Sequence, residues 1–407
     1  MTVRIAAVVL ALAVVGGALW FGFGPGAGPA VGACTAAATA EPPPPPAITG
    51  NPPAVRWERA TLPDGLDDAG EQVMLDVAAF GGGFVAVGRS SVAGGASHAF
   101  LLHSVDGRSW EVVSADTRFA DAEVSRLTVV GTRLFGTGSV SIDDRGGSRA
   151  GVWFTDDGRT WSEASGPFDE TVPLSVASVD GELLMIGSAN EDGRTLSWRS
   201  EDGASWMSEE LVLPVSGDAG HISEVATFGD GLMAVGSISR GGDGPAAPAV
   251  WRSGDGVAWS CHLLDAAGFR VLHASTLTRA GTSWLATGGG GDGCGFGASC
   301  PGVSLSWGSA DGLTWSRAAG AAEPTVAGTT DPAGAADGFL GVSHGATWLS
   351  PDATSWMRLS EGETSGELAG QVDAVTLTDD GQIVVAGTTY DANSDAGPWI
   401  AIGELSP

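Results

Sequence analysis

One seven-residue motif recurs six times along this chain and strongly limits the folds that it can adopt. The motif follows Ser/Thr-x-Asp-Gly-x-Ser/Thr-Trp, with copies that begin at Ser104, Thr155, Ser200, Ser253, Ser309 and Ser350. Aspartate accepts hydrogen bonds from backbone N–H groups two residues on, and glycine supplies the positive φ of a tight turn. Each copy therefore predicts a β-hairpin turn, and a unit repeated six times predicts a repeat architecture. The aspartates are interpreted as structural turn locks: Asp106, Asp157, Asp202, Asp255, Asp311 and Asp352.

Two further regularities accompany every motif. A bulky residue precedes the motif tryptophan by eight positions in each copy, namely Leu102, Trp153, Trp198, Trp251, Trp307 and Trp348. Further upstream, an alternating run and a Gly-rich turn lead to a second run that ends in glycine, and these glycines are Gly88, Gly138, Gly187, Gly236 and Gly288. Four short strands in a unit of about 50 residues are typical of a propeller blade.

A seventh unit and the start of the chain set the number of blades. Residues 372–377, 383–387 and 399–402 repeat the first three strands, but no fourth strand follows. The segment Arg56–Pro63 resembles the residues that follow each motif, so it can supply the missing strand. The sequence therefore predicts an all-β fold at residues 54–405. This fold is a seven-bladed β-propeller of four-stranded antiparallel blades, whose last blade is closed by an N-terminal strand.

The motif resembles the Asp-box, or bacterial neuraminidase repeat, of sialidase-like propellers, some endoglucanases, sortilin-type receptors and photosystem assembly factors. The usual pattern has one more residue between Asp and Gly, and Ala353 replaces the glycine of the sixth copy. The resemblance implies that ligands bind on the face opposite the Asp boxes. A sialidase would also need an arginine triad, a Tyr nucleophile beside a Glu, an Asp acid/base and a Phe-Arg-Ile-Pro segment.

Only fragments of that sialidase set are present. The string Phe269-Arg270-Val271 lacks the proline and lies in mid-chain, and Tyr390 is the only tyrosine. Tyr390 falls in a loop that we expect on the ligand face, which makes it the one catalytic candidate. The alternative is that Tyr390 is a surface contact, because no partner of a nucleophile is recognisable beside it.

A set of polar residues recurs inside the first strand of the units. When the units other than the irregular sixth are aligned on the apolar residue that ends this strand, the position four residues earlier is always polar, giving Asp76, Arg126, Ser175, Glu224, His273 and Asp373. We expect these side chains at one mouth of the central channel. They then either form a ligand-binding ring or simply face channel water. Nearby loops add Arg118, Arg145, Arg149, Arg194, Arg240 and Arg270.

Residues 1–33 are predicted to be a signal peptide or an N-terminal membrane anchor. The uncharged run Ile5–Phe23 is just long enough to span a bilayer, and Arg4 precedes it, which favours export of the rest. Val31–Cys34 resembles a lipobox, so Cys34 is a candidate for lipidation. The alternatives are an uncleaved helix and release after Ala40. Residues 34–53 include five consecutive prolines and are predicted to be an extended tether.

The remaining cysteines and the net charge restrict the environment and the partners. Cys294 and Cys300 lie in one Gly-rich insertion and predict a disulfide rather than a zinc site, because no His or second Cys pair is nearby. Cys261 is interpreted as a buried free thiol. The net charge of −29, with 19 basic and 48 acidic residues, argues against nucleic acid and anionic lipid as partners.

These observations lead to two functional expectations. The first is a monomeric, extracytoplasmic propeller, tethered to the membrane through its N-terminal segment only, that binds a glycan or an envelope protein without catalysis. The alternative is an exo-acting glycosidase of the sialidase type. Neither reading calls for a cofactor or a metal, and a purely structural envelope protein is a third possibility.

Overall fold

The computed structural model describes residues 34–36 and 54–406. Gaps in the second range fall at residues 65, 67–69, 92–96, 114–118, 143–147, 190–193, 210, 212, 216–218, 240–245, 267–270, 292–302, 319–332, 336–337, 344–345, 362–367, 369, 379 and 392–395. The predicted N-terminal anchor and the cysteines at positions 294 and 300 lie outside the described residues. Within the described part of the chain, no helix is long and apolar enough to cross a membrane.

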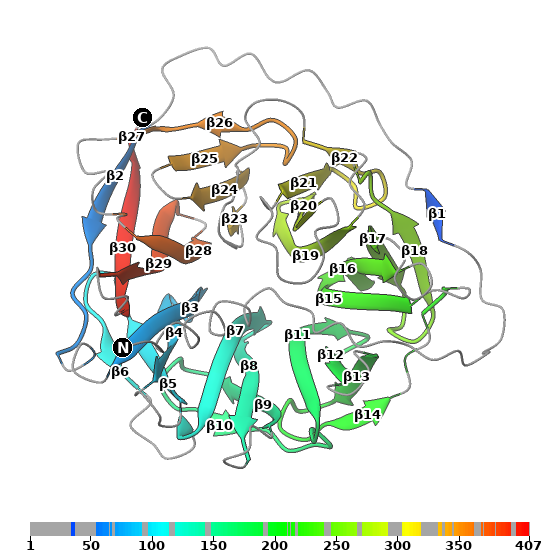
Figure 1. Cartoon of the computed structure of the whole chain (residues 1–407), viewed down its shortest axis with the longest axis horizontal. Helices are drawn as coiled ribbons and strands as arrows, with labels where there is room; N and C mark the ends of the chain where they lie inside the picture. Colours follow the sequence, from blue (N-terminus) through cyan, green and yellow to red (C-terminus); the bar gives the residue numbers. More distant parts are fainter. Residues whose placement is uncertain are drawn as a thin grey trace, which may run out of the picture.

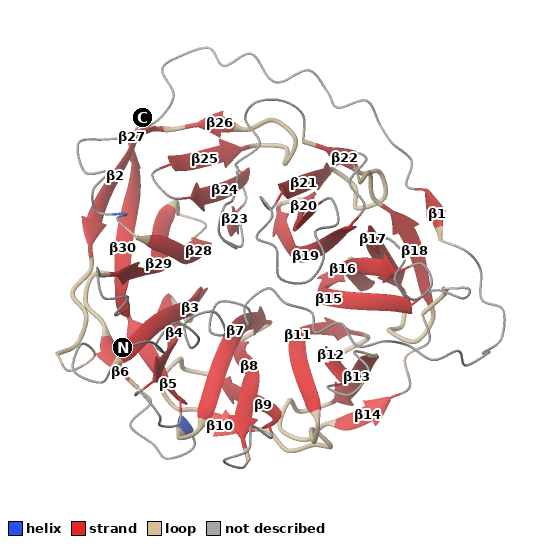
Figure 2. Cartoon of the chain, viewed as in Figure 1, coloured by secondary structure: helices blue, strands red, loops and turns tan. Residues whose placement is uncertain are grey.

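Seven antiparallel sheets stand around a central axis, and the chain is almost entirely strand and loop (Figures 1 and 2). The first three blades are β3–β6 (Glu71–Phe80, Gly83–Ser91, Ser97–Ser104, Glu111–Val112), β7–β10 (Ala122–Val130, Arg133–Ser141, Ser148–Thr155, Ser162–Glu163) and β11–β14 (Thr171–Val179, Glu182–Ala189, Thr195–Ser200, Met207–Glu209).

The next three blades are β15–β18 (Ala219–Phe228, Gly231–Ser239, Ala246–Ser253, Trp259–Leu263), β19–β22 (Val271–Ala280, Ser283–Gly291, Val303–Ser309, Ser316–Arg317) and β23–β26 (Ala333–Ala335, Gly338–Ser343, Ala346–Ser350, Met357–Arg358). Blade 7 combines β28–β30 (Gln371–Leu377, Gln382–Tyr390, Ala396–Ser406) with β2 (Ala54–Arg59). The predicted seven-bladed fold is confirmed.

The N-terminal strand β2 completes blade 7, as predicted. It pairs antiparallel with β30, in the register that places Ala54 opposite Ser406 and Trp57 opposite Gly403. The Trp57 ring is buried, and its edge lies where a side chain on Gly403 would otherwise stand. A further short strand, β27 (Ser360–Glu361), pairs in parallel with β2. The outer strand of the last blade therefore has a partner on both sides.

The six repeated motifs form the hydrogen-bonded turns that their sequence predicts. In the second copy, Asp157 Oδ1 accepts the N–H groups of Arg159 (2.8 Å) and Thr160 (2.7 Å), and Gly158 has a φ of 74°. These N–H groups, that of Thr160 foremost, lower the pKa of Asp157 to about 2. In the sixth copy, Ala353 adopts the same backbone conformation, with a φ of 63°. The turns lie at the end of the ring where each third strand finishes. We call this end the lower face and the opposite end the upper face.

A bulge in the inner strand explains why the second strand carries a glycine at a fixed position. In blade 2 the pairing skips one residue between Val124 and Arg126, and Gly138 lies opposite Val124. A Cβ atom on Gly138 would overlap the carbonyl oxygen of Glu123. The same skip occurs in blades 1, 3, 4, 5 and 7. The bulge turns the residue that follows it towards the next blade.

Apolar side chains fill the spaces between neighbouring blades. The tryptophans of the third strands are central to this packing, since Trp153, Trp198, Trp251 and Trp307 are all fully buried. Aromatic pairs such as Phe168 with Trp198, at 6.0 Å between ring centroids, add edge-to-face contacts. The core is therefore a ring of interfaces rather than one central cluster.

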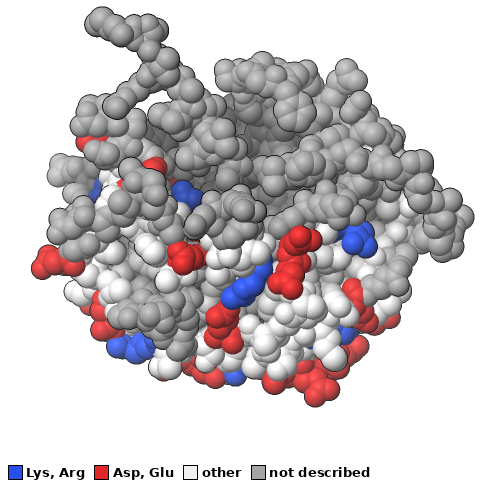
Figure 3. Space-filling view, turned by 60° about the horizontal axis from the view of Figure 1, so that its bottom comes forward, with Lys and Arg blue, Asp and Glu red and all other residues white. Residues whose placement is uncertain are grey.

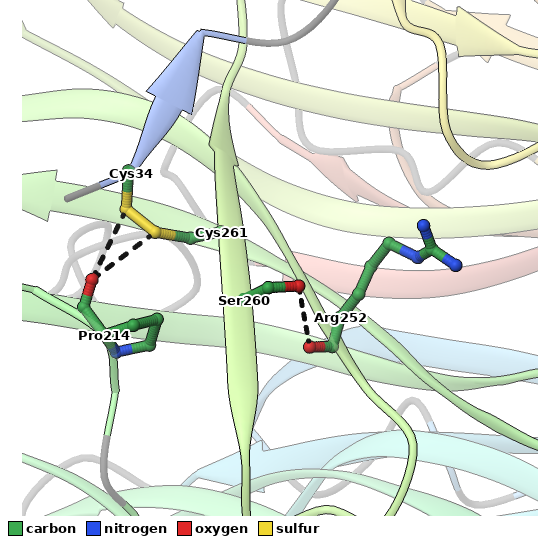
Figure 4. The surroundings of a disulfide bond; sticks show 5 residues. All are labelled: Cys34, Pro214, Arg252, Ser260 and Cys261. Carbon is green, nitrogen blue, oxygen red and sulfur yellow. Dashed lines mark hydrogen bonds between the residues drawn. A yellow bond between two sulfur atoms is a disulfide. The ribbon is translucent and has the colours of Figure 1, made fainter. Parts of the chain in front are cut away.

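The N-terminal residues 34–36 lie against blade 4, far from β2. Strand β1 (Thr35–Ala36) pairs in parallel with β18, and Cys34 forms a disulfide with Cys261 (Figure 4). Two sequence predictions are corrected here, because Cys261 is not a free thiol and the Cys34 sulfur is not available for acylation. The predicted tether is also shorter at its start, since its first residues are part of a propeller sheet.

Candidate functional site

The upper face of the ring is the end at which the inner strands begin and the second strands finish. The inner strands are β3, β7, β11, β15, β19, β23 and β28. Each second strand runs back towards this face, so Arg89 in β4 and Tyr390 in β29 both lie there. The Asp turns join third to fourth strands at the lower face, away from these residues. This arrangement agrees with the expected separation between turns and ligand face.

Four of the six predicted ring residues occupy equivalent positions. Asp76, Arg126, Ser175 and Glu224 each follow the bulge of their inner strand directly. His273 and Asp373 do not, and the prediction of a six-membered ring is corrected in blades 5 and 7.

The error in these two blades comes from hairpins of unequal length. In blade 5 the inner strand continues past Leu277 to Ala280, so the residue after the bulge is Thr276. In blade 7 the hairpin after Leu377 is longer, and the equivalent residue is Ala374. An alignment on Leu277 and Leu377 therefore places the expected ring residue three positions too early in blade 5 and one position too early in blade 7.

Three of the ring residues tie their own blade to the next one. Asp76 Oδ2 accepts the Leu127 N–H of blade 2 at 2.7 Å, and Ser175 Oγ accepts the Val225 N–H of blade 4 at 2.8 Å. Glu224 Oε2 accepts the Leu277 N–H of blade 5 at 3.1 Å. An inner strand has no partner strand on its channel side, so its N–H groups there need other acceptors. These three side chains are therefore structural ties.

Arg126 and Glu224 form an ion pair between blades 2 and 4. The guanidinium Nη1 lies 2.7 Å from Glu224 Oε2, and the two side chains are 26% and 18% exposed. Both groups are thus largely withdrawn from water, where an ion pair is screened less than at the surface. Glu224 satisfies two partners at once, the Arg126 guanidinium and the Leu277 N–H.

The imidazole of His273 is uncharged near neutral pH. It lies in β19 opposite Gly289, three residues nearer the upper face than Thr276. Burial lowers the pKa of His273 below its usual value of 6.5. A neutral imidazole keeps one N–H group, so His273 can still donate one hydrogen bond.

Asp373 lies in a different environment, at the junction of blades 7 and 1. Its Oδ1 accepts a hydrogen bond from Gln371 Nε2 at 2.7 Å, and its Oδ2 accepts one from Thr388 Oγ1 at 2.5 Å. Burial raises the pKa of Asp373 from 3.8 to about 6, although both hydrogen bonds oppose the shift. A carboxyl group that gains or loses its proton near neutral pH can act as an acid or a base.

Tyr390 and Gln72 lie on two strands, β29 and β3, that pack against each other at the same junction. Thr388 Oγ1 accepts the Met74 N–H at 3.1 Å, which brings β29 of blade 7 against β3 of blade 1. Tyr390 and Gln72 each lie two residues nearer the upper face than this contact, on the sides of their strands that meet. Gln72 is 1% exposed and its Oε1 has no hydrogen-bond partner among the described residues.

The electrostatic surroundings of Tyr390 come from both blades. The side chain is 45% exposed. Burial is the main cause that raises the pKa of Tyr390. The charges of Asp373 and Glu71 raise it further, and the Arg89 charge lowers it. Arg89 in turn pairs with Glu123 of blade 2 at 2.8 Å. The tyrosine hydroxyl is therefore protonated at neutral pH and can donate or accept a hydrogen bond.

We refer to Gln72, Gln371, Asp373, Thr388 and Tyr390 as the junction cluster. Sequence reasoning placed Asp373 and Tyr390 on one predicted ligand face, but it missed the other three residues and the junction of blades 7 and 1 that joins them. Strand β29 did contain a signal, because polar residues follow Gly387 directly in Thr388-Thr389-Tyr390. Over the described ranges, no three His, Cys, Asp or Glu side chains lie close enough to hold a metal ion.

The loop arginines do not form a basic surface in the part of the chain that the structure describes. Arg149 pairs with Glu163 at 2.6 Å. Four of the others lie outside the described residues, at positions 118, 145, 240 and 270. In the view of Figure 3, basic side chains lie among acidic ones. Arg149 is therefore paired with a carboxylate of an acidic surface.

The chain resembles several solved propellers. It is 12% identical to the GH93 α-L-arabinofuranosidase of Fusarium graminearum in complex with arabinobiose, over 81% of this chain and 92% of that chain, with a TM-score of 0.47. A protein of unknown function from Dyadobacter fermentans is 13% identical over 87% and 100%, with a TM-score of 0.48. The GH32 β-fructofuranosidase of Bombyx mori is 11% identical over 83% and 88%, with a TM-score of 0.38.

No protein-family model and no curated protein matches the chain. The seven sheets make the chain a seven-bladed β-propeller, and its structural neighbours include glycoside hydrolase propellers of families GH93 and GH32. At these identities and TM-scores, the neighbours do not indicate what this protein binds.

Proposed function

We propose that the protein is a binding module and that its ligand, a glycan, occupies the junction cluster. The observation that carries this proposal is the buried Gln72 Oε1, which has no hydrogen-bond partner among the described residues and belongs to β3, the strand that packs against β29 with its half-exposed Tyr390. A sugar hydroxyl can donate to Gln72 Oε1 and to Asp373, and it can exchange hydrogen bonds with the Tyr390 hydroxyl. The exposed aromatic ring offers an apolar surface to the face of a sugar.

The composition of the junction cluster supports a functional role rather than a purely structural one. A buried acceptor without a donor costs about 1–3 kcal/mol, and a carboxyl group with a raised pKa also lowers stability near neutral pH. The ring residues at positions 76, 175 and 224 are used by the fold itself, because they accept backbone N–H groups. The junction cluster therefore replaces the six-residue ring as the proposed ligand site.

We also propose that the propeller is exported and tethered to the membrane by its N-terminal segment, and that its six turns belong to the Asp-box family. The Cys34–Cys261 disulfide supports an oxidising compartment, because such bonds persist outside the cytosol. The apolar run Ile5–Phe23 supports a membrane segment. A monomer without a cofactor remains the simplest expectation for such a module.

A second candidate function is exo-acting glycoside hydrolysis of the sialidase type. It is favoured by Asp373, whose pKa of about 6 suits a general acid near neutral pH, beside Tyr390 as a nucleophile. Glu71 would then be the nearby carboxylate that assists the tyrosine, since its charge acts on Tyr390. The two candidate functions use the same residues, but only a glycosidase would hydrolyse the glycan that it binds.

Retention on a glycan array, followed by calorimetric titration of the retained glycan, tests the binding proposal. Tyr390→Ala and Gln72→Leu are expected to weaken binding by about 10- to 100-fold, since each removes a hydrogen-bonding partner in a shielded site. The control is Glu201→Gln, an exposed residue of the lower face. If no glycan is retained, or if both variants bind like the control, the junction cluster is not a glycan site.

Release of the fluorophore from a panel of 4-methylumbelliferyl glycosides, including the sialoside, separates the two candidates. A binding module gives no release above the buffer rate. A glycosidase gives release that Asp373→Asn abolishes while glycan retention persists. The rate of release would then fall above about pH 6, where Asp373 loses the proton that a general acid needs.

Asp373→Asn is expected to stabilise the protein at pH 8 by about 1–3 kcal/mol and to leave stability unchanged at pH 4. The pKa of Asp373 is about 6 in the folded protein and 3.8 in the unfolded chain. The folded state therefore holds its proton longer, and stability is lost as the pH rises from about 4 through 6. Urea unfolding at both pH values measures the difference. Equal curves at pH 8 would contradict the burial of an ionisable Asp373.

A further inference from the structure

We infer, on the basis of the proposed function, that the glycan bound by the junction cluster carries a free amine. The preferred ligand is then a hexosamine with a protonated amine, rather than a neutral or an acidic sugar. Three features of the described residues point to this class of glycan. They are an acceptor without a donor, an excess of negative charge and an exposed aromatic ring.

The hydrogen bonds of the junction cluster favour a ligand that is rich in donors. Gln371 Nε2 and Thr388 Oγ1 both donate to Asp373, at 2.7 and 2.5 Å. Gln72 Oε1 belongs to a side chain that is 1% exposed, and it receives no hydrogen bond from the described residues. An ammonium group has three N–H donors and no acceptor, whereas a hydroxyl has one donor and two acceptor lone pairs. A protonated amine therefore complements these oxygens better than a hydroxyl does.

The residues that supply these oxygens belong to strands that are bonded to each other. Thr388 Oγ1 contacts Asp373 Oδ2 and also accepts the Met74 N–H at 3.1 Å. Gln72 lies two residues from Met74 along β3, and Tyr390 lies two residues from Thr388 along β29. Each of these steps is about 7 Å long, and both run towards the upper face. One ligand at the upper end of this junction can therefore contact both strands.

The carboxylates around Tyr390 give this junction a negative charge. Asp373 and Glu71 both act on the tyrosine as negative charges, and the exposed Asp391 follows it directly in the chain. Within the described part of the chain, neither Glu71 nor Asp373 forms an ion pair with a basic group. Asp76, the other carboxylate of β3, accepts backbone N–H groups instead. A cationic ligand is therefore favoured over an anionic one.

The described arginines of these two blades that could meet an acidic sugar have other partners. Arg89, the basic group that acts on Tyr390, pairs with Glu123 at 2.8 Å. The guanidinium carbon of Arg59 lies 4.4 Å from the centroid of the Trp399 ring. The chain contains no lysine that could replace them. A sugar carboxylate would thus lack the cationic partner that such a group usually has in a binding site.

The exposed ring of Tyr390 suits both parts of a hexosamine. The side chain is 45% exposed, so a face of the ring is open to a ligand. An aromatic face attracts a cation within about 6 Å of its centroid, and it also packs against the apolar face of a sugar. The tyrosine therefore favours the same charge as the carboxylates around it.

Calorimetric titration at pH 7 with three β-1,4-linked disaccharides tests the role of the amine. Cellobiose, N,N′-diacetylchitobiose and the glucosamine dimer share one skeleton and differ in the group at C2, which is a hydroxyl, an acetamide or an amine. The glucosamine dimer is expected to bind about 10- to 100-fold more tightly than cellobiose, because its hydrogen bonds to Asp373 are charge-assisted.

Variants of the two carboxylates locate the effect. In Asp373→Asn the advantage of the glucosamine dimer over cellobiose should fall about tenfold, while cellobiose itself binds as before. Glu71→Gln should reduce the advantage about two- to threefold, since this carboxylate is exposed and therefore screened. The matched control is Glu201→Gln, which removes the same charge from the lower face of a chain with a net charge of −29. It should leave the advantage unchanged.

The pH dependence gives a second readout. Asp373 has a pKa of about 6, so it gains a proton as the pH falls from 7 to 5 and loses its attraction for the amine. The affinity for the glucosamine dimer should therefore fall about tenfold over this range, because the amine stays protonated. Cellobiose should bind almost equally at both pH values, and Asp373→Asn should remove the dependence for the dimer.

The outcomes separate the class of glycan from the binding function itself. If the three disaccharides bind equally, or if the glycan array retains only glycans without a free amine, the amine is not recognised but the binding module stands. If the array retains no glycan and none of the three disaccharides binds, both proposals fail. An equal loss of the dimer's advantage in Asp373→Asn and Glu201→Gln would show attraction to the acidic chain as a whole, and it would overturn a specific amine site.

Discussion

Replacing Trp57 by alanine is expected to lower the free energy of unfolding by about 3–5 kcal/mol, the range found for buried aromatic residues. Trp57 is 2% exposed and belongs to the core cluster between blades 6 and 7. It also holds β2 against Gly403 of β30. Loss of the ring leaves a cavity beside β2, the strand that joins the start of the propeller to its last blade. Urea unfolding followed by tryptophan fluorescence and circular dichroism measures the change.

The matched control for this prediction is Arg56→Ala, the neighbouring residue on the exposed side of the same strand. A surface substitution of this kind changes stability by about 0.5 kcal/mol or less. The two variants share the same strand and the same backbone pairing, so the comparison isolates the buried ring. Equal effects of Trp57→Ala and Arg56→Ala would mean that β2 does not contribute its side chains to ring closure.

Glu224→Ala is expected to destabilise the propeller by about 2–4 kcal/mol. The substitution removes the acceptor of the Leu277 N–H and the carboxylate that pairs with the partly buried Arg126 guanidinium. The estimate is below that for a fully buried pair, because both side chains retain some contact with water. Chemical denaturation at pH 7 measures it.

A conservative variant separates the two parts of this effect. Glu224→Gln retains an oxygen for the Leu277 N–H and loses only the charge, so we expect about half of the destabilisation. Arg126→Met combined with Glu224→Gln removes both charges, and it should recover part of the loss because no uncompensated charge remains. Additive effects of the two substitutions would contradict an energetic coupling between these residues.

The number of blades could be predicted from sequence because each repeat is locally determined. An Asp that accepts N–H groups two and three residues away forms its turn from neighbouring residues alone, as Asp157 does. The missing strand at Arg56–Pro63 was recognisable for the same reason, since it repeats a local pattern. The glycine at the end of each second strand was visible as well, but its cause, a bulge in the partner strand, was not.

The candidate site was harder to predict because it depends on register and on pairs that are distant in sequence. His273 was misplaced since the hairpin of blade 5 begins after Ala280 and not after Leu277. The junction cluster joins residues from the first and the last blade, and no local pattern indicates that β3 packs against β29. The partner of Cys34 lies 227 residues away, so the lipobox resemblance was the only local signal at that position.

Closure of the ring by β2 also determines how this propeller can come apart. An open array of repeats has free ends, and its terminal units can melt while the middle stays folded. Here the strand that precedes the first blade is built into the last one, and Thr61 next to it bonds the turn of blade 1 through Arg108 and Trp110. The seam is therefore bonded on both sides, to the last blade through β30 and to the first blade through the turn that contains Arg108 and Trp110. Fraying cannot start there, and the seven blades are expected to melt together in a single transition.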